Sequence, residues 1–240
     1  MARLLLGSGG LSTPERKYAW IQSLDSFLGN TQSILFIPYA LKDYDAYVKK
    51  IEELNLHSGR NLRGIHTFSD PHQAIAEADS IFIGGGNSFR LLNTLYSHQL
   101  LKSIQDRVLR GVPYVGISAG TNMACPTIKT TNDMPIVSPP SLDALGFIPF
   151  QINPHFFPGA VYTQIGPENY LRYGGETRED RLREFHEMND VPVLGIFEGG
   201  ILHVEGNEAV LEGTAGAKLF RKGLPPESLE VGARLDPLLL

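Results

Sequence analysis

Residues 114–125 read YVGISAGTNMAC, and this stretch decides how the rest of the chain is interpreted. Its first four residues are apolar enough for a buried strand, and residues 121–125 are compatible with a helix. Between them, Ser118 stands in the pattern Gly-x-Ser-x-Gly. Glycines flank a serine in this way where a sharp strand-to-helix turn leaves no room for side chains. The stretch therefore predicts a strand, a tight turn that projects the serine hydroxyl above the sheet, and a helix.

The same order of strand and helix recurs earlier in the chain. Apolar runs at residues 4–6, 34–37 and 81–83 each end at Gly or Pro, and segments with helical periodicity follow them. We also expect a weaker strand at residues 63–68. Continuous apolar strands that alternate with helices indicate a parallel sheet covered by helices on both faces.

The second half of the chain has a different composition. Residues 126–177 are rich in Pro, Gly, Asn and Thr, which predicts long loops. A helix at 178–188, a strand at 193–197 and a hairpin around Gly206-Asn207 complete the predicted fold. Because no linker or repeat is visible, we expect one domain over residues 1–240. Its predicted architecture is a three-layer α/β/α sandwich with a mostly parallel sheet, a nucleophile elbow after a central strand, and a C-terminal β-hairpin.

Charge and hydropathy exclude several classes of partner. The 240 residues carry 21 Lys and Arg against 26 Asp and Glu, a net charge of −5, so no basic footprint for nucleic acid is present. No apolar run approaches the roughly 18 residues that a membrane span needs, and the run at 4–6 is too short for a secretory signal. The single cysteine, Cys125, cannot form an internal disulfide. We therefore expect a cytoplasmic protein with a small-molecule partner, no nucleic acid and no membrane, and the sequence leaves open a homodimer.

Ser118 is the candidate nucleophile, and backbone N–H groups beside it are candidates for an oxyanion hole. The N–H of Ala119 lies at the start of the predicted helix, where an anion is favoured. A second donor is expected near Gly86, in the Gly-Gly-Gly-Asn stretch that ends at Asn87. This stretch does not match a nucleotide-binding fingerprint. The alternative for Ser118 is a helix cap between two packing glycines.

A serine nucleophile needs a base, and His155 is the candidate among seven histidines. It lies in Gln-Ile-Asn-Pro-His-Phe-Phe, where a proline and apolar neighbours predict a rigid, semi-buried loop. A core histidine bonded to the backbone is the alternative. We expect solvated surface positions for His57, His98, His186 and His203.

Two acids compete to orient the base. Glu198 follows the strand at 193–197 and would lie at the edge of the sheet, where sites in parallel sheets collect. Asp133 is the competitor, and either acid could instead cap a loop. Metal catalysis has little support because His186-Glu187 lacks the second histidine of His-Glu-x-x-His, so no metal or other cofactor is expected.

Residues 175–181, Gly-Glu-Thr-Arg-Glu-Asp-Arg, combine a capping threonine with Arg178 and Arg181 on one helical face. Such a charge run is commonly a solvated helix start. Its guanidinium groups could also receive a substrate carboxylate.

Three stretches together resemble the peptidase E family of α-aspartyl dipeptidases: residues 116–136, 151–156 and 175–181. The resemblance covers most of the chain, including residues 84–87. It implies a serine exopeptidase that cleaves dipeptides with an N-terminal aspartate, on a fold related to class I glutamine amidotransferases. The chain departs from the family pattern at Gly199-Gly200, where Gly-Asn is expected after the glutamate.

The resemblance assigns a role to each candidate residue. The family's serine, histidine and glutamate fall on Ser118, His155 and Glu198, which are the predicted nucleophile, base and orienting acid. Gly86 and Ala119 would hold the oxyanion, and the predicted substrate-binding residues for a small acidic dipeptide are Asn87, Asp133 and Arg178. The alternatives are a cyanophycinase-like or isoaspartyl hydrolase of the same fold and a catalytically silent binding module.

Overall fold

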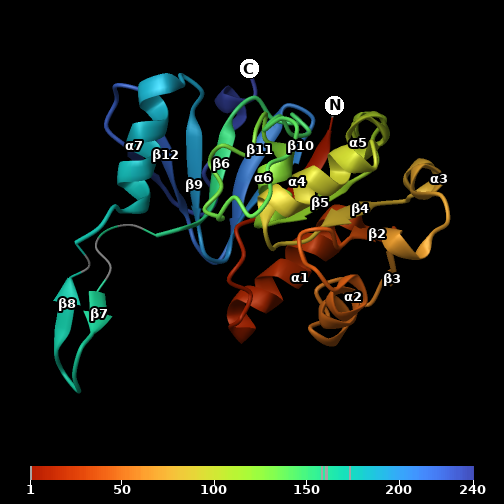
Figure 1. The fold of residues 1–240 in the computed structure, drawn as a ribbon, viewed down its shortest axis with the longest axis horizontal. Coiled ribbons are helices and arrows are strands. Elements are labelled where there is room, and N and C mark those ends of the chain that lie inside the picture. Colours follow the sequence, from red (N-terminus) through yellow and green to blue (C-terminus); the bar gives the residue numbers. More distant parts are fainter. Residues whose placement is uncertain (1, 158, 160–161, 173) are drawn as a thin grey trace.

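A seven-stranded sheet forms the centre of the computed structural model, which describes residues 2–157, 159, 162–172 and 174–240 (Figure 1). Five neighbouring strands of this sheet are parallel, and the two at one edge are antiparallel. In spatial order the strands are β11 (Glu208–Gly213), β10 (Gly200–Glu205), β1 (Arg3–Gly7), β5 (Tyr114–Ile117), β4 (Ile81–Ile83), β2 (Ser33–Ile37) and β3 (Asn61–Gly64). The predicted mostly parallel α/β sheet is confirmed.

Helices cover both faces of this sheet. Alternate strand residues point to opposite faces, so Leu5 packs with one helix layer while Leu4 and Leu6 pack with the other. The first layer consists of α1 (Pro14–Leu28) and α2 (Tyr44–Glu53). The second consists of α3 (Pro71–Glu77), α4 (Ser88–Ser97), α5 (Leu100–Leu109) and α6 (Ala119–Ala124).

A second sheet, which the sequence did not predict, lies beside the first (Figure 1). Its order is β13 (Glu227–Leu229), β12 (Ala217–Phe220), β9 (Val193–Phe197) and β6 (Gln151–Phe156), and β6 and β9 are parallel. The prediction of a single sheet is thus wrong, because β9 pairs with β6 and β12 and not with the central strands. Helix α7 (Arg178–Met188) packs on this sheet through Leu182, which contacts the cluster around Phe156.

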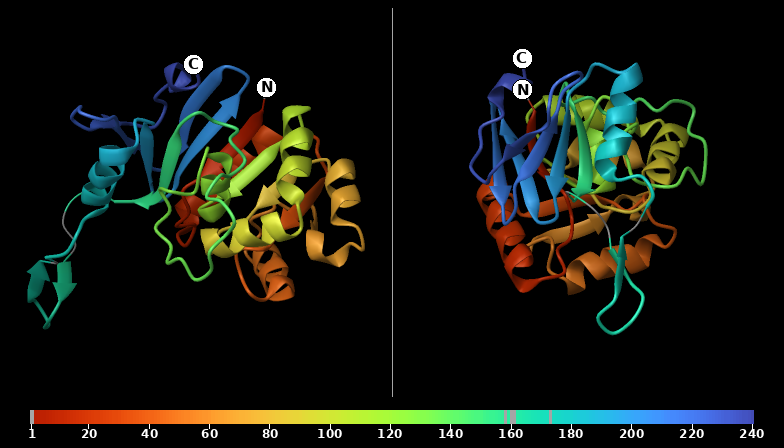
Figure 2. Two further views of the ribbon diagram at one scale, coloured as in Figure 1. Left: turned by 45° about the horizontal axis from the view of Figure 1, so that its top comes forward. Right: turned by 90° about the vertical axis from the view of Figure 1, so that its left-hand side faces the viewer.

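Two local predictions also differ from the structure. The expected strand at 63–68 is displaced: β3 ends at Gly64, and residues Ile65–Thr67 form a 3₁₀ turn in which Thr67 Oγ1 donates to the Gly64 carbonyl at 2.8 Å. The expected loop at 126–177 contains β6 and a small hairpin of β7 (Tyr162–Gln164) and β8 (Tyr170–Arg172). This hairpin extends away from the body of the protein in all three ribbon views (Figures 1 and 2).

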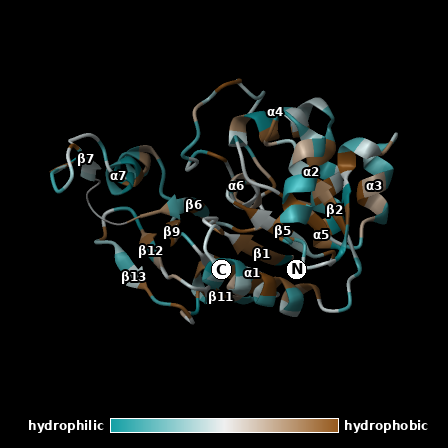
Figure 3. Cartoon of the chain, turned by 90° about the horizontal axis from the view of Figure 1, so that it is seen from below, coloured by the Kyte–Doolittle hydropathy of each residue, from teal (hydrophilic) through white to brown (hydrophobic). Residues whose placement is uncertain are grey.

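Hydropathy follows this architecture. Brown, hydrophobic residues concentrate in the central strands in Figure 3, while teal, hydrophilic residues gather on outer helix turns and loops. Large side chains such as Trp20, Phe36 and Phe82 are fully buried. No helix in the described ranges is long and apolar enough to cross a membrane.

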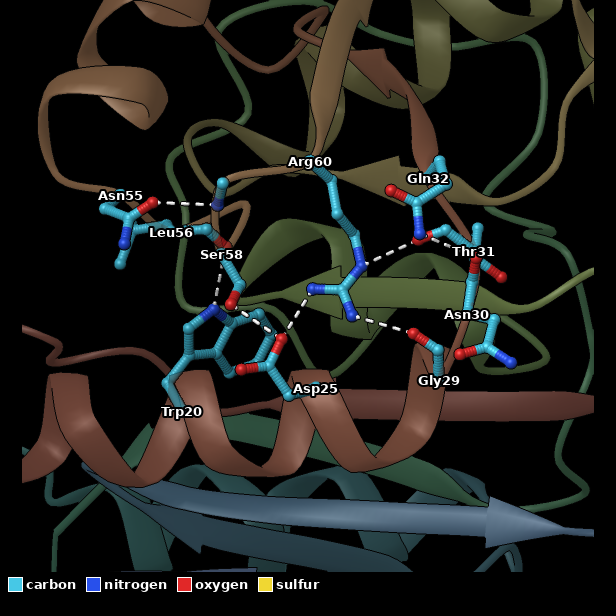
Figure 4. Close-up of polar contacts among 11 residues, drawn as sticks. Trp20, Asp25, Gly29, Asn30, Thr31, Gln32, Asn55, Leu56, Ser58 and Arg60 are labelled. Carbon is cyan, nitrogen blue, oxygen red and sulfur yellow. Dashed lines mark hydrogen bonds and ion pairs between the residues drawn. The ribbon is translucent and has the colours of Figure 1, made fainter.

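A polar network ties the loop after α2 to helix α1 (Figure 4). The Arg60 guanidinium donates to Asp25 Oδ1 at 2.6 Å and to the carbonyls of Thr31 and Gly29 at 3.0 and 3.3 Å. Ser58 Oγ donates to the same carboxylate at 2.7 Å. Burial alone would raise the pKa of Asp25, but the Ser58 and Arg60 hydrogen bonds and the Arg60 charge outweigh it and leave the pKa below its ordinary value.

The Arg60 network predicts a pH-dependent contribution to stability. Arg60→Ala should lower the free energy of unfolding by about 1–3 kcal/mol, because it removes three hydrogen bonds donated by a charged guanidinium, one of them to the Asp25 carboxylate, from a side chain that is 9% exposed. A carboxyl group whose pKa is lower in the folded state than in the unfolded state stabilises the fold fully above the unfolded-state pKa, and this stabilisation is lost as pH falls through the folded-state pKa. The difference between wild type and Arg60→Ala should therefore narrow below pH 3.8, the ordinary Asp value.

Chemical denaturation at pH 7 and at pH 3.5 measures both parts of this prediction. Lys49→Ala is the control, since Lys49 pairs only with Glu53 across an exposed helical turn. Its effect should stay within about 0.5 kcal/mol. A constant Arg60→Ala effect at both pH values would show that Asp25 does not contribute to the network's stability.

Candidate active site

Ser118 lies at the tight turn between β5 and α6, with φ +55 and ψ −109. A Cβ on Gly116 would lie 2.6 Å from the Gly120 carbonyl oxygen, and one on Gly120 would lie 2.0 Å from that of Ile83. Both glycines are therefore required by close backbone packing. The positive φ at a serine costs about 1–3 kcal/mol, which the surrounding structure must offset.

His155 comes from the second sheet. The sequence predicted a loop for His155, and this prediction is wrong because the residue belongs to strand β6. It stands at an irregularity where the β6–β9 register shifts between Asn153 and Phe156. Its φ is +53. Asn132 Nδ2 donates to the Pro154 carbonyl at 2.7 Å, and the backbone N–H of His155 donates to Ser8 Oγ at 2.8 Å. These contacts hold the strand in the bent conformation.

These elements bring Ser118, His155 and Glu198 together. His155 Nε2 lies 2.8 Å from Ser118 Oγ, and His155 Nδ1 lies 2.7 Å from Glu198 Oε1. A neutral imidazole with its proton on Nδ1 satisfies both contacts, because Nδ1–H donates to the carboxylate and Nε2 accepts from the hydroxyl. Such a chain can move a proton from the serine to the histidine while the carboxylate stabilises the imidazolium.

The loop after β1 supports the histidine and the glutamate, and sequence reasoning missed this role. A Cβ on Gly9 would lie 2.4 Å from His155 Cε1, and one on Gly10 would lie 1.4 Å from Glu198 Oε2. Ser8 is fully buried and donates to the Ile196 carbonyl at 2.9 Å while it accepts from His155. The signal was the Gly-Ser-Gly-Gly run at 7–10, which ends the predicted first strand and does not match a nucleotide-binding fingerprint.

Arg16 is a second residue that sequence reasoning missed. Its Nη1 lies 3.6 Å from Glu198 Oε2 and donates to the Gly10 carbonyl at 3.2 Å. The guanidinium therefore holds the far oxygen of the carboxylate while the near oxygen faces His155. No sequence pattern links residue 16 to residue 198, because only the packing of α1 beside the end of β9 brings them together.

Two backbone N–H groups close to Ser118 in the sequence or in the fold have no acceptor among the described residues. Neither the Gly86 nor the Ala119 N–H donates a hydrogen bond to another group in the described ranges. Gly85 lies directly against the serine, since a Cβ there would be 3.5 Å from Ser118 Oγ. Gly86, with φ +132, packs against the Ala40 carbonyl. The peptide units of this glycine run thus approach Ser118 closely and leave N–H groups available.

Asp133 and Asn87 have structural partners near the start of α4. Asp133 Oδ2 accepts from the Ser88 N–H and hydroxyl, both at 2.7 Å, and from Thr131 Oγ1 at 3.0 Å. Asn87 caps the helix through the Arg90 N–H at 3.0 Å and donates to the Met134 carbonyl at 2.8 Å. Glu198, and not Asp133, contacts His155.

Arg178 is the first residue of α7, whose N-terminus is closed by the predicted Thr177 cap and a reciprocal bond to Asp180. Its guanidinium carbon lies 5.2 Å from the centre of the Phe157 ring. Burial lowers the Arg178 pKa, the charge of Arg181 lowers it further, and Asp133 and Glu198 oppose both effects. Its Nε is buried and has no hydrogen-bond partner in the described part of the chain.

Other candidates are placed away from the reaction. His186 is buried and its Nε2 contacts the Val191 carbonyl at 3.1 Å, so the expected solvated position is wrong. His203 is partly buried, with Nδ1 2.9 Å from Glu212. Cys125 is buried, and burial raises its thiol pKa to about 12. Among the described residues, no three His, Cys, Asp or Glu side chains form a group that could hold a metal ion.

A parallel α/β sheet with a hydrogen-bonded serine, histidine and glutamate at its edge defines the class of serine hydrolases. Comparison with known proteins narrows this class. The family model of peptidase family S51 matches residues 3–212. The chain belongs to this family of serine peptidases.

Individual relatives support the same family assignment. The chain is 48% identical over 219 residues to peptidase E of Streptomyces coelicolor, covering 91% of this chain and 87% of the relative. It is 46% identical over 211 residues to a Drosophila melanogaster protein named "Probable alpha-aspartyl dipeptidase", covering 88% and 85%. The crystal structure of a peptidase from an acI-B1 actinobacterium shares the fold, with a TM-score of 0.69, 18% identity and coverage of 98% and 96%.

Gly10, in the loop after β1, packs against the Glu198 carboxylate, so its substitution should impair catalysis. Gly10→Ala places a methyl group where Glu198 Oε2 lies, so the carboxylate must leave His155. We expect kcat to fall by about 10²-fold or more. Gly59 has nearly the same φ, +69 against +68, and open space around its Cα.

Gly59→Ala therefore costs the same backbone strain, about 1–2 kcal/mol of stability, without touching the site. Peptidase assays on both purified variants, together with thermal unfolding, separate the two effects. Equal activity in Gly10→Ala and Gly59→Ala would contradict the supporting role assigned to the loop.

Proposed function

We infer that the chain is a serine dipeptidase that removes an N-terminal aspartate from dipeptides. The observation that carries this inference is the contact chain from Ser118 through His155 to Glu198, in a chain that is 42–48% identical to peptidase E relatives. The dipeptide class comes from those relatives, and the site supplies its own support in the charge and size of the space around Ser118.

In the proposed mechanism, Ser118 Oγ attacks the main-chain carbonyl carbon of the aspartate, and His155 Nε2 takes the hydroxyl proton. Glu198 accepts from His155 Nδ1–H throughout and stabilises the imidazolium. The tetrahedral intermediate collapses as His155 returns the proton to the leaving amine, which leaves an aspartyl ester on Ser118. Water then attacks this ester with the same base, and free aspartate leaves.

The oxyanion of each tetrahedral intermediate would accept hydrogen bonds from the N–H groups of Gly86 and Ala119. Both groups lack partners in the described ranges, and the Ala119 N–H lies at a helix N-terminus. Backbone donors of this kind need no reorganisation during the reaction. The strained turn at Ser118 supports the role of a nucleophile elbow, since it holds the serine next to both donors.

Recognition of aspartate requires a local cation, because a chain with a net charge of −5 repels an acidic ligand on average. Arg178 suits this role. Its Nε is buried with no hydrogen-bond partner among the described residues, and a guanidinium can bind a carboxylate through two parallel hydrogen bonds. Asp133 and Asn87, beside the start of α4, are proposed to border the same region and to contact the amino end of the substrate.

The size of the cleft at Ser118 favours a dipeptide over the alternatives. Its volume is about 260 Å³, below the usual range for drug-sized ligands, which favours a small substrate over an aspartyl polymer. A catalytically silent binding module would not need the three-member hydrogen-bonded chain. We further propose that residues 1–240 act as one catalytic domain, since Ser118 comes from the first half of the chain and Glu198 from the second.

The catalytic assignment predicts the behaviour of two variants. Ser118→Ala should abolish hydrolysis of Asp-Leu, with a loss of about 10⁴-fold or more in kcat, and should leave the unfolding midpoint near that of the wild type. Glu198→Gln should lose orders of magnitude in kcat with little change in KM, because the charge matters most when imidazolium forms. Steady-state kinetics measure both effects. A far larger loss in Asp133→Asn than in Glu198→Gln would exchange the roles of the two acids.

The specificity assignment predicts a substrate-dependent effect at Arg178. Arg178→Met should lower kcat/KM for Asp-Leu by about 10²-fold or more, because the substrate carboxylate loses a charged partner. Its effect on Asn-Leu, which carries no such charge, should be much smaller. Arg181→Met is the control, since Arg181 is exposed and lies near Glu176. Equal losses with both substrates would make Arg178 structural.

A further inference from the structure

The proposed mechanism leaves one end of a dipeptide without a partner. A dipeptide with an N-terminal aspartate carries two carboxylates, one on the aspartate side chain and one at its C-terminus. Arg178 accounts for the first. A dipeptidase must also distinguish the second from a continuing chain, and a buried or half-buried carboxylate needs a cation or hydrogen-bond donors.

The cleft at Ser118 lies on the side of the sheet covered by α1 and α2. The residues around it include Ser118, His155, Gly86 and Lys50, whereas Arg178, Asn87 and Asp133 are absent from the described residues that line it. Since His155 must protonate the leaving amine, the leaving residue has to lie beside His155. The cleft is therefore positioned for the second residue of the dipeptide, and the aspartate lies on the opposite side of Ser118, toward α4 and α7.

One face of α2 lines this cleft. Tyr47, Lys50, Ile51 and Leu54 stand at positions i, i+3, i+4 and i+7, which share one side of a helix. Tyr47 also donates to the Gly85 carbonyl at 2.8 Å and so ties this helix to the glycine run beside the serine. Lys49, which precedes Lys50, lies on another face of the helix and pairs with Glu53.

Most of the other side chains that line the cleft are apolar. Leu56 lines it, and the Leu56 carbonyl accepts from Trp20 Nε1 at 3.0 Å, within the network that holds the 55–60 loop (Figure 4). Phe82 and Ile117 complete the apolar surface. An apolar side chain such as leucine would fit against these residues.

Lys50 is the only cationic side chain among the described residues that line the cleft, and no carboxylate lines it. Within the described ranges, its ammonium makes no ion pair, unlike that of Lys49. We propose that Lys50 binds the C-terminal carboxylate of the leaving residue. The site would thus hold the dipeptide between two cations, Arg178 for the aspartate side chain and Lys50 for the free C-terminus. This inference rests on the proposed dipeptidase function.

Two substrates that differ only in the terminal charge test this assignment. Wild type, Lys50→Met and Lys49→Met are assayed on Asp-Leu and on Asp-Leu amide, whose C-terminus is uncharged. Lys50→Met should lower kcat/KM for Asp-Leu by about tenfold, because a charged hydrogen bond is lost, and should change that for the amide less than twofold. Lys49→Met should change neither substrate. Lys50→Arg, which keeps the charge, should retain most of the activity on Asp-Leu.

The outcomes separate this proposal from the function on which it rests. Wild type that hydrolyses neither substrate would overturn the dipeptidase function itself. Hydrolysis by wild type with an equal loss on both substrates in Lys50→Met would overturn only the carboxylate assignment, since Lys50 would then support α2 or the aspartate. No loss on either substrate would overturn it as well. The preference for Asp-Leu over the amide should also shrink at high salt, because the pair is partly exposed.

Discussion

The contact between Ser118 Oγ and His155 Nε2, at 2.8 Å, joins two sheets, and much of the structure serves to make it possible. Ser118 follows the central strand of the large sheet, and His155 lies near the end of β6 in the small one. Both residues adopt a positive φ, near +55 and +53, which few non-glycine residues do. The strain on each side is tolerable because glycines, backbone hydrogen bonds and the loop after β1 hold the two turns in place.

The loop at residues 8–10 follows β1 of the large sheet and is hydrogen-bonded to β6 and β9 of the small sheet. Ser8 accepts from the N–H of His155 and donates to the Ile196 carbonyl, and its own N–H donates to the Gly200 carbonyl at 3.0 Å. Gly9 and Gly10 let the loop pass beneath the histidine and glutamate without a side chain. Ser8, Gly9 and Gly10 thus help to hold the base and the acid of one sheet beside the nucleophile of the other.

The charged side chains around Ser118, His155 and Glu198 suit the small anionic substrate proposed for the site. Arg16 lies near one oxygen of the Glu198 carboxylate, and His155 donates its Nδ1–H to the other. Arg178, in α7, and Lys50, in α2, approach the site from different helices. Because the overall charge is −5, recognition of an acidic ligand would depend on these two proposed cations.

The elements whose cause is local could be predicted from the residues alone. The apolar run before Gly-x-Ser-x-Gly specified β5 and its turn because only glycine fits where backbones meet at Gly116 and Gly120, and Thr177 specified the start of α7 through a cap three residues long. The tertiary structure alone decided which sheet β9 joins, why β6 is a bent strand and not a loop, and that Arg16, Ser8 and Lys50 reach the site. Those outcomes depend on pairing between residues that lie far apart in the sequence, such as Gln151 with Val193 and Ser8 with His155, and hydrophobic periodicity carries no information about such partners.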